Sequence, residues 1–120
     1  MVDPAPERGG CFDAMCPARE ILTHVTGRWG VLILAALYPD GVLRFSELRS
    51  RIGGISEKML AQRLRELEGD GLLLRESRPI VPPYVDYRLT KLGAGVAKHL
   101  ATLLQWIEAN AGEMRGATRR

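Results

Sequence analysis

The sequence predicts a mainly α-helical domain with a small β-hairpin, arranged as a winged helix-turn-helix. Two observations predict this fold class. First, two amphipathic helical segments are separated by Gly53-Gly54, a dipeptide that interrupts helical periodicity. Second, two short apolar segments at 72–74 and 85–89 flank a proline-rich loop at 79–83, as the strands of a hairpin do. In this order of elements, the second helix is the one that enters the major groove of DNA.

The first two helices are expected ahead of this unit. Cys16-Pro17 suits a helix start, because proline is favoured at the first helical position, and Thr26-Gly27 ends or bends this helix. Apolar residues then recur over 29–37 with the spacing of a core-facing helix. Pro39-Asp40-Gly41 stops that second helix.

Three further helices are expected to begin near Phe45, after Ser56 and after Thr90. Ser56 is a good N-cap, and Leu60, Leu64 and Leu67 form the apolar stripe of the helix that it opens. The stripe of the last helix is longer and comprises Leu92, Val96, Leu100, Leu103 and Ile107, with Leu104 and Trp106 beside it.

That stripe offers more apolar surface than a small domain needs from one terminal helix. Two interpretations stay open: packing in the core of the chain, or a homodimer interface shared with the first helix. The candidate interface residues are Ile21, Leu100, Leu103, Trp106 and Ile107.

The chain of 120 residues is long enough for one domain, expected over 13–112. A disordered lead is expected over 1–12 and a basic tail over 113–120. No signal peptide or membrane-spanning segment is recognised, and two cysteines do not make a disulfide scaffold in a chain of this length. We therefore expect a cytoplasmic protein.

Positive charge is concentrated in the predicted helix-turn-helix. The segment 44–65 holds six basic and two acidic residues, so its net charge of +4 exceeds the +3 of the whole chain. A local basic patch of this kind is typical of a surface that binds phosphate. Double-stranded DNA is therefore the expected partner.

The fourth helix is expected to read the bases. Lys58, Gln62 and Arg65 point away from its apolar stripe, with Arg63 on a flank; Gln bonds adenine in two places, and Arg or Lys bonds guanine. Two interpretations of the wing loop stay open: contact with the DNA backbone or minor groove, or a stiff turn that makes no contact. The full set of candidate DNA-binding residues is Arg44, Ser46, Ser56, Lys58, Met59, Gln62, Arg63, Arg65, Arg78, Pro83 and Tyr84.

Cys16 is a candidate redox-sensing residue. It lies at a helix start, where the helix dipole favours a negative charge, and thiolates are the form that oxidants attack. The alternative is a small structural residue. Cys11 and Cys16, with His24 and His99 far away in sequence, match no metal-ligand spacing. No metal and no cofactor are expected.

Two other classes of function compete with DNA binding. One is a winged-helix module that binds protein and not DNA, and the local charge with Lys58, Gln62 and Arg65 disfavours it. The other is a small enzyme, which the sequence disfavours because it shows no nucleophile with a nearby base and no phosphate-binding glycine loop. We therefore do not expect an enzyme.

Several motifs in fixed order resemble the HxlR family of bacterial transcription regulators. They are Cys16-Pro17, the segments 26–29 (TGRW), 43–48 (LRFSEL) and 54–60 (GISEKML), and the segments 64–72 and 81–90. The resemblance implies a winged helix-turn-helix homodimer, formed by the first and last helices, that binds a pseudo-palindromic operator. Some members sense oxidants or electrophiles through a cysteine at the position of Cys16.

Overall fold

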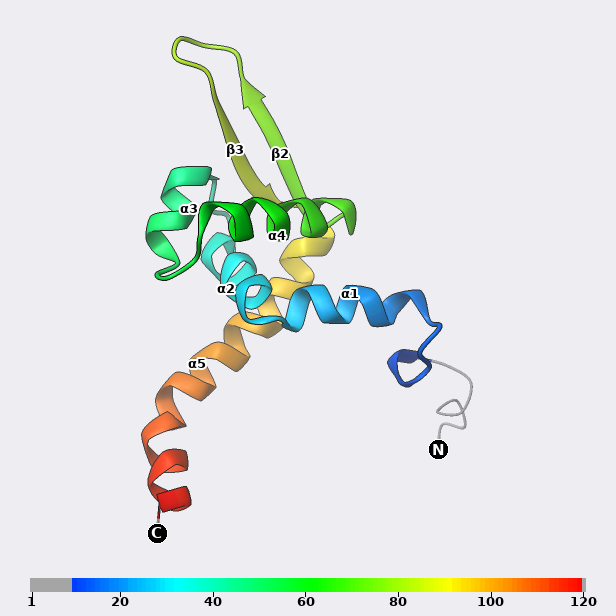
Figure 1. The fold of residues 1–120 in the computed structure, drawn as a ribbon, viewed down its shortest axis with the longest axis vertical. Helices are drawn as coiled ribbons and strands as arrows, with labels where there is room; N and C mark the ends of the chain where they lie inside the picture. Colours follow the sequence, from blue (N-terminus) through cyan, green and yellow to red (C-terminus); the bar gives the residue numbers. More distant parts are fainter. Residues whose placement is uncertain (1–9, 120) are drawn as a thin grey trace.

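The computed structural model describes residues 10–119. Five helices and a three-stranded sheet make up the fold (Figure 1). The helices are α1 (Pro17–Thr26), α2 (Arg28–Leu37), α3 (Phe45–Arg51), α4 (Glu57–Gly69) and α5 (Lys91–Arg119), and the strands are β1 (Leu43–Arg44), β2 (Leu73–Arg78) and β3 (Tyr84–Leu89). A short 3-10 turn, η2 (Gly10–Phe12), precedes α1. The predicted mainly helical fold with a hairpin is confirmed.

The ends of the chain differ from the expected domain boundaries. Most of the predicted lead, residues 1–9, lies outside the described residues, as does Arg120. The segment 113–119, expected to be a separate basic tail, continues α5. No helix break separates it from the domain.

A close helix crossing joins α1 to α2. The two helices meet at a bend of 75°, and Gly27 ends α1 by donating its N–H to the carbonyl of Thr23 (3.1 Å). At Gly30 a Cβ would lie 2.0 Å from the carbonyl oxygen of His24, so this position has no room for a side chain. Among residues 10–119, no single helix is long and apolar enough to cross a bilayer, and α1 with α2 pass that test only as a bent pair.

The core forms where α2, α3, α4 and α5 meet at the base of the sheet. Its members are buried leucines, isoleucines and small residues from every one of these elements: Ile33, Leu34, Leu37, Leu48, Leu60, Leu64, Leu67, Leu73, Tyr87, Ala97 and Leu100. The inward orientation predicted for Leu60, Leu64 and Leu67 is confirmed. His24 Nδ1 donates to Asp70 Oδ2 (2.6 Å) and so ties α1 to the end of α4.

The sheet has one strand more than the predicted hairpin. β1 pairs with β3 in antiparallel register, Leu43 opposite Tyr87 and Arg44 opposite Asp86. The strand order is β1-β3-β2. Because a two-residue strand carries no periodicity, the sequence did not reveal β1.

The register divides the wing, β2 with β3 and their loop, into two faces, since side chains alternate along a strand. The inner face carries Leu73, Arg75, Ser77, Val85, Tyr87 and Leu89, and the outer face carries Leu74, Glu76, Arg78, Tyr84, Asp86 and Arg88. The base of the inner face is buried in the core at Leu73 and Tyr87.

The apolar stripe expected on α5 is divided along the helix into a buried part and an exposed part, here called the outer stripe. Ala97 and Leu100 are buried in the core, whereas Leu103, Trp106 and Ile107 are exposed. The C-terminal half of α5 extends away from the body, at the end of the molecule opposite the wing (Figure 1). The part of α5 around Ala97 and Leu100 therefore completes the core, and the part from Leu103 onward exposes its apolar side chains to solvent.

Candidate nucleic-acid interface

Local contacts define the starts of both helices of the helix-turn-helix. Glu47 Oε1 accepts the backbone N–H of Arg44 at the start of α3 (2.8 Å). Ser56 Oγ accepts the N–H of Met59 (3.0 Å), which confirms Ser56 as the N-cap of α4. In the turn between the two helices, Gly54 has a φ of +89°, a conformation that favours glycine.

The exposed face of α4 carries the side chains expected to read DNA. Lys58, Gln62 and Arg65 are all exposed, and within residues 10–119 none of them takes part in an ion pair or a side-chain hydrogen bond. Ser56 is exposed beside them, and Met59 is half-buried against the core. The face of α4 opposite the core is thus free to contact a partner.

Other arginines of the helix-turn-helix are already engaged within the chain. Arg63 pairs with Glu66 on the same helix (3.1 Å), and its side chain is 29% exposed. Arg49 on α3 pairs with Glu57 at the start of α4 (3.0 Å) across the turn. The expected contribution of Arg63 to DNA binding therefore competes with an existing ion pair.

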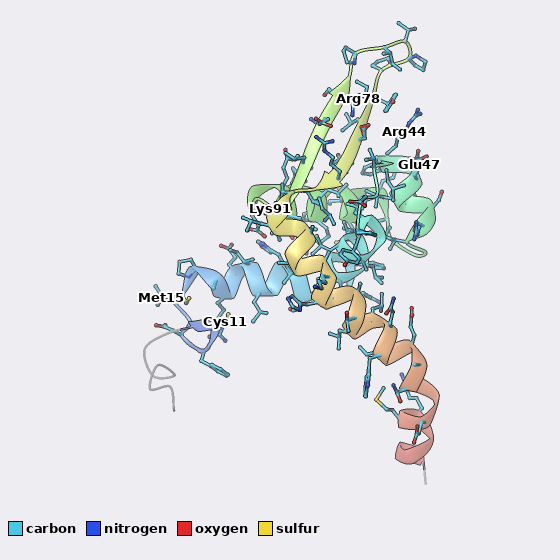
Figure 2. All side chains as sticks on the ribbon, turned by 180° about the vertical axis from the view of Figure 1, so that it is seen from behind. Cys11, Met15, Arg44, Glu47, Arg78 and Lys91 are labelled. Carbon is cyan, nitrogen blue, oxygen red and sulfur yellow. The ribbon has the colours of Figure 1, made fainter. Side chains whose placement is uncertain are left out.

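Arg44 connects the start of α3 to the wing. Its guanidinium lies 3.7 Å from the centroid of the Tyr84 ring, within the range of a cation–π contact. Figure 2 shows Arg44 and Glu47 at the start of α3, beside the wing that carries Arg78. Ser46 is exposed on the first turn of α3. The structure thus brings Arg44 into contact with Tyr84, which is distant in sequence.

The outer face of the wing holds a network of ion pairs. Arg78 Nε donates to Asp86 (3.0 Å), Arg78 also pairs with Glu76 (3.2 Å), and Arg88 pairs with Glu76 (3.3 Å). The hydrogen bond to the buried Asp86 carboxylate is the main cause that raises the pKa of Arg78, with the charge of Asp86 next. Arg78 is a candidate DNA-binding residue, and its charge is already paired with Asp86 and Glu76 within the wing. The pairing depends on the strand register, so sequence reasoning missed it.

The tip of the wing is apolar and open. Val81 is 96% exposed and Ile80 is 55% exposed, and Pro83 is exposed next to them. Tyr84 is half-buried under Arg44. The candidate residues of the wing are therefore Pro83 in the apolar tip, Tyr84 next to it at the start of β3, where Arg44 of β1 stacks on its ring, and Arg78 opposite Tyr84 on β2.

The two cysteines lie at the N-terminal end of α1. Cys16 is the N-cap residue of α1, and its side chain makes no capping hydrogen bond. Cys11 and Cys16 are both free thiols of intermediate exposure. Figure 2 shows Cys11 at this end of the molecule, far from the wing. In the described part of the chain, no group of three His, Cys, Asp or Glu side chains is placed to hold a metal ion.

The candidate dimer residues do not share one environment. Ile21, Leu103, Trp106 and Ile107 are exposed, with Trp106 at 56%. Leu100 differs from the expectation, because it is 7% exposed and packs in the core of its own chain. Leu22, Met15 and Met114 are also exposed near these residues in sequence. Exposed apolar side chains thus lie on both α1 and the outer stripe of α5.

A helix, a tight turn, a second helix with an exposed polar face and an adjoining β-hairpin define a winged helix-turn-helix protein. Residues 24–115 match the family described as HxlR-like helix-turn-helix. The chain belongs to the HxlR family, as its sequence motifs suggested.

Named relatives agree with this assignment. The chain is 56% identical over 108 residues to YtfH of Escherichia coli (strain K12), an uncharacterized HTH-type transcriptional regulator, covering 90% of this chain and 85% of that protein. The structure of ytfH from Salmonella typhimurium, named as a transcriptional regulator, has a TM-score of 0.87 at 54% identity over 94% of this chain and 100% of that chain. The structure of the redox regulator HypR in its oxidized form has a TM-score of 0.71 at 36% identity, over 79% of this chain and 97% of that chain.

These relatives are named as transcriptional regulators. The chain is accordingly a helix-turn-helix transcriptional regulator.

Proposed function

We propose that the protein regulates transcription by binding a specific duplex DNA sequence, with α4 as its recognition helix. The observation that carries this proposal is the exposed face of α4. Lys58, Gln62 and Arg65 lie there without partners in residues 10–119, whereas the neighbouring Arg49 and Arg63 are tied into ion pairs. Side chains of these types, free on one helix face, suit the donor and acceptor pattern of the major groove.

We further propose that the protein binds as a homodimer to a pseudo-palindromic operator. The radius of gyration of the chain is 16.9 Å, against roughly 14 Å for a compact domain of this length. The C-terminal half of α5 projects from the body (Figure 1), and its exposed apolar side chains favour a second subunit over water. A twofold dimer presents two copies of α4 to two half-sites.

The experiment is a titration of labelled genomic fragments with the purified protein, repeated at several salt concentrations. We expect nanomolar to micromolar affinity that falls steeply as salt rises, because phosphate contacts release counterions. One fragment or a few should bind much more tightly than the others. Absence of binding to any duplex at low salt would contradict the proposal and favour a winged helix that contacts protein.

A second candidate function is a response to oxidants through Cys16. The observation that favours it is the free thiol at the start of α1, together with the similarity to HypR, which is named a redox regulator. Because α1 belongs to the proposed dimer interface, a modified Cys16 would change how the subunits meet. That change would alter the distance between the two recognition helices.

A further inference from the structure

A hollow of about 470 Å³ lies between α4 and the wing. Its lining comes from three elements, with Arg75 from β2, Tyr87 from β3 and, from α4, Ala61, Leu64, Arg65 and Glu68. Leu64 and Tyr87 are buried and form its floor. Arg65 and Arg75 are exposed and stand on opposite walls, one on the helix and one on the strand.

Arg75 differs from the other two arginines of the wing strands. The register places Arg75 opposite Tyr87, on the inner face that meets α4. Arg78 and Arg88 lie on the outer face, where Glu76 and Asp86 neutralise them. Within the described chain Arg75 forms no ion pair. The wing therefore directs its free positive charge toward the recognition helix.

We propose that this hollow is a binding site for a backbone phosphate of DNA, held jointly by Arg65 and Arg75. The proposal rests on the proposed DNA binding and assigns Arg75 as a further contact residue. When α4 lies in the major groove of DNA, the sugar-phosphate backbone that borders the groove passes beside the helix. A guanidinium presents several N–H donors in a planar fork that suits phosphate oxygens. Two such groups on facing walls hold one phosphate between helix and wing.

Glu68 limits the strength of this site. Its carboxylate lines the same hollow and repels an anion, so the three charged side chains sum to a single positive charge. A contact to phosphate carries no sequence information and fixes the position of the protein on the duplex. Arg65 and Arg75 are thus expected to set affinity and register, while base preference comes from Lys58 and Gln62 on α4.

The test compares Arg75→Ala with Arg88→Ala, a matched control on the same hairpin whose guanidinium is on the outer face. Binding to the tightest genomic fragment and to an unrelated duplex is measured over a range of salt concentrations. Arg75→Ala should weaken both duplexes by the same factor and reduce the slope of log affinity against log salt by about 0.9, the value for one phosphate. Arg88→Ala should keep the wild-type slope. Equal losses for the two variants, or an unchanged slope for Arg75→Ala, would overturn the proposal.

Two additional variants test whether one phosphate is shared. The double variant Arg65→Ala/Arg75→Ala should lose less affinity than the product of the two single losses, because both residues act on the same group. Strict additivity would contradict a shared phosphate. Glu68→Gln should tighten both duplexes, and no change there would also count against the site. If the wild-type protein binds no duplex at low salt, the proposed function is wrong. If the wild type binds but Arg75→Ala changes neither affinity nor salt slope, only this inference is wrong.

Discussion

Gln62 and Arg63 are neighbours on α4 whose environments differ. Gln62 is exposed and has no side-chain partner within residues 10–119, whereas Arg63 is half-buried and paired with Glu66. An amide on the free face bonds both N6 and N7 of adenine, and such a bidentate contact discriminates between bases. At the scale of single residues, an existing ion pair within the chain decides whether a side chain is free to contact DNA: Gln62 is free, and Arg63 is not.

Gln62→Ala tests this directly. We expect it to cost about 1–3 kcal/mol on the preferred duplex, the range for one bidentate base contact, and to leave affinity for an unrelated duplex nearly unchanged. The measurement is a pair of binding titrations at one salt concentration. Equal losses on both duplexes would mean that Gln62 does not read a base.

Cys16 is the other residue whose role a single substitution decides. We expect diamide to change the operator affinity of wild-type protein, because oxidation of a thiol at the start of α1 alters the proposed dimer contact. Cys16→Ser should not respond. Cys11→Ser identifies the second thiol, because diamide joins two thiols in a disulfide and is itself reduced to the hydrazine. A retained response shows that Cys16 pairs with another copy of Cys16 in the dimer, and a lost response shows that it pairs with Cys11. Equal responses of wild type and Cys16→Ser would remove Cys16 as the sensor.

At the scale of elements, the crossing of α1 and α2 depends on the absence of a side chain at one position. A Cβ at Gly30 would lie 2.0 Å from the backbone oxygen of His24, and a backbone atom cannot swing aside as a flexible side chain can. Gly30→Ala should therefore destabilise the protein by about 3 kcal/mol, the upper end of the range for an overpacked interior.

The matched control is Gly95→Ala, because Gly95 is also helical and a Cβ there meets nothing within 4 Å. That substitution should stabilise the fold by about 0.4–1 kcal/mol through reduced freedom of the unfolded chain. Urea unfolding of both variants measures the two effects. Loss of stability in both, or in neither, would contradict the account of the crossing.

Local signals explain which elements were predictable from the sequence. Pro17 and Ser56 mark helix starts by their own backbone chemistry, and both are found where expected. β1 could not be predicted from the sequence because it is defined only by its pairing with β3. The ion pair of Arg78 with Asp86 and the position of Arg75 could not be predicted either, since both depend on the register between β2 and β3.

The split stripe of α5 has a different origin. Leu100 and Leu103 follow one helical pattern, yet one is buried and the other is 51% exposed. The periodicity of a helix identifies its apolar surface, but not where the rest of the chain stops covering it. Choosing between core packing and a second subunit therefore required knowing where α5 leaves the body.

At the scale of the whole molecule, the wing and the free half of α5 lie at opposite ends (Figure 1). DNA bound at α4 and the wing would leave the outer stripe of α5 uncovered. A second subunit that joins through α1 and α5 fits this separation, because the two recognition helices then stay free to face one duplex. Their spacing must match half-sites one helical turn apart, about 34–36 Å.

Leu103→Glu and Trp106→Glu are the variants that test this assembly. In a dimer, each would bury an uncompensated charge, which costs about 3–5 kcal/mol. Because both side chains are exposed in the single chain, the fold itself should persist, and circular dichroism checks that it does. We expect sedimentation to show a dimer for wild type at micromolar concentration and a monomer for both variants.

The control is Gln105→Glu, which introduces the same carboxylate beside Trp106 at another exposed position of α5. A helix turns by about 100° per residue, so position 105 points away from the stripe of Leu103 and Trp106, and the variant should stay dimeric. The two monomeric variants should also lose affinity for the palindromic operator while keeping weak binding to a half-site, since each α4 remains intact. A wild-type monomer at micromolar concentration would contradict the dimer, and with it the two-half-site operator.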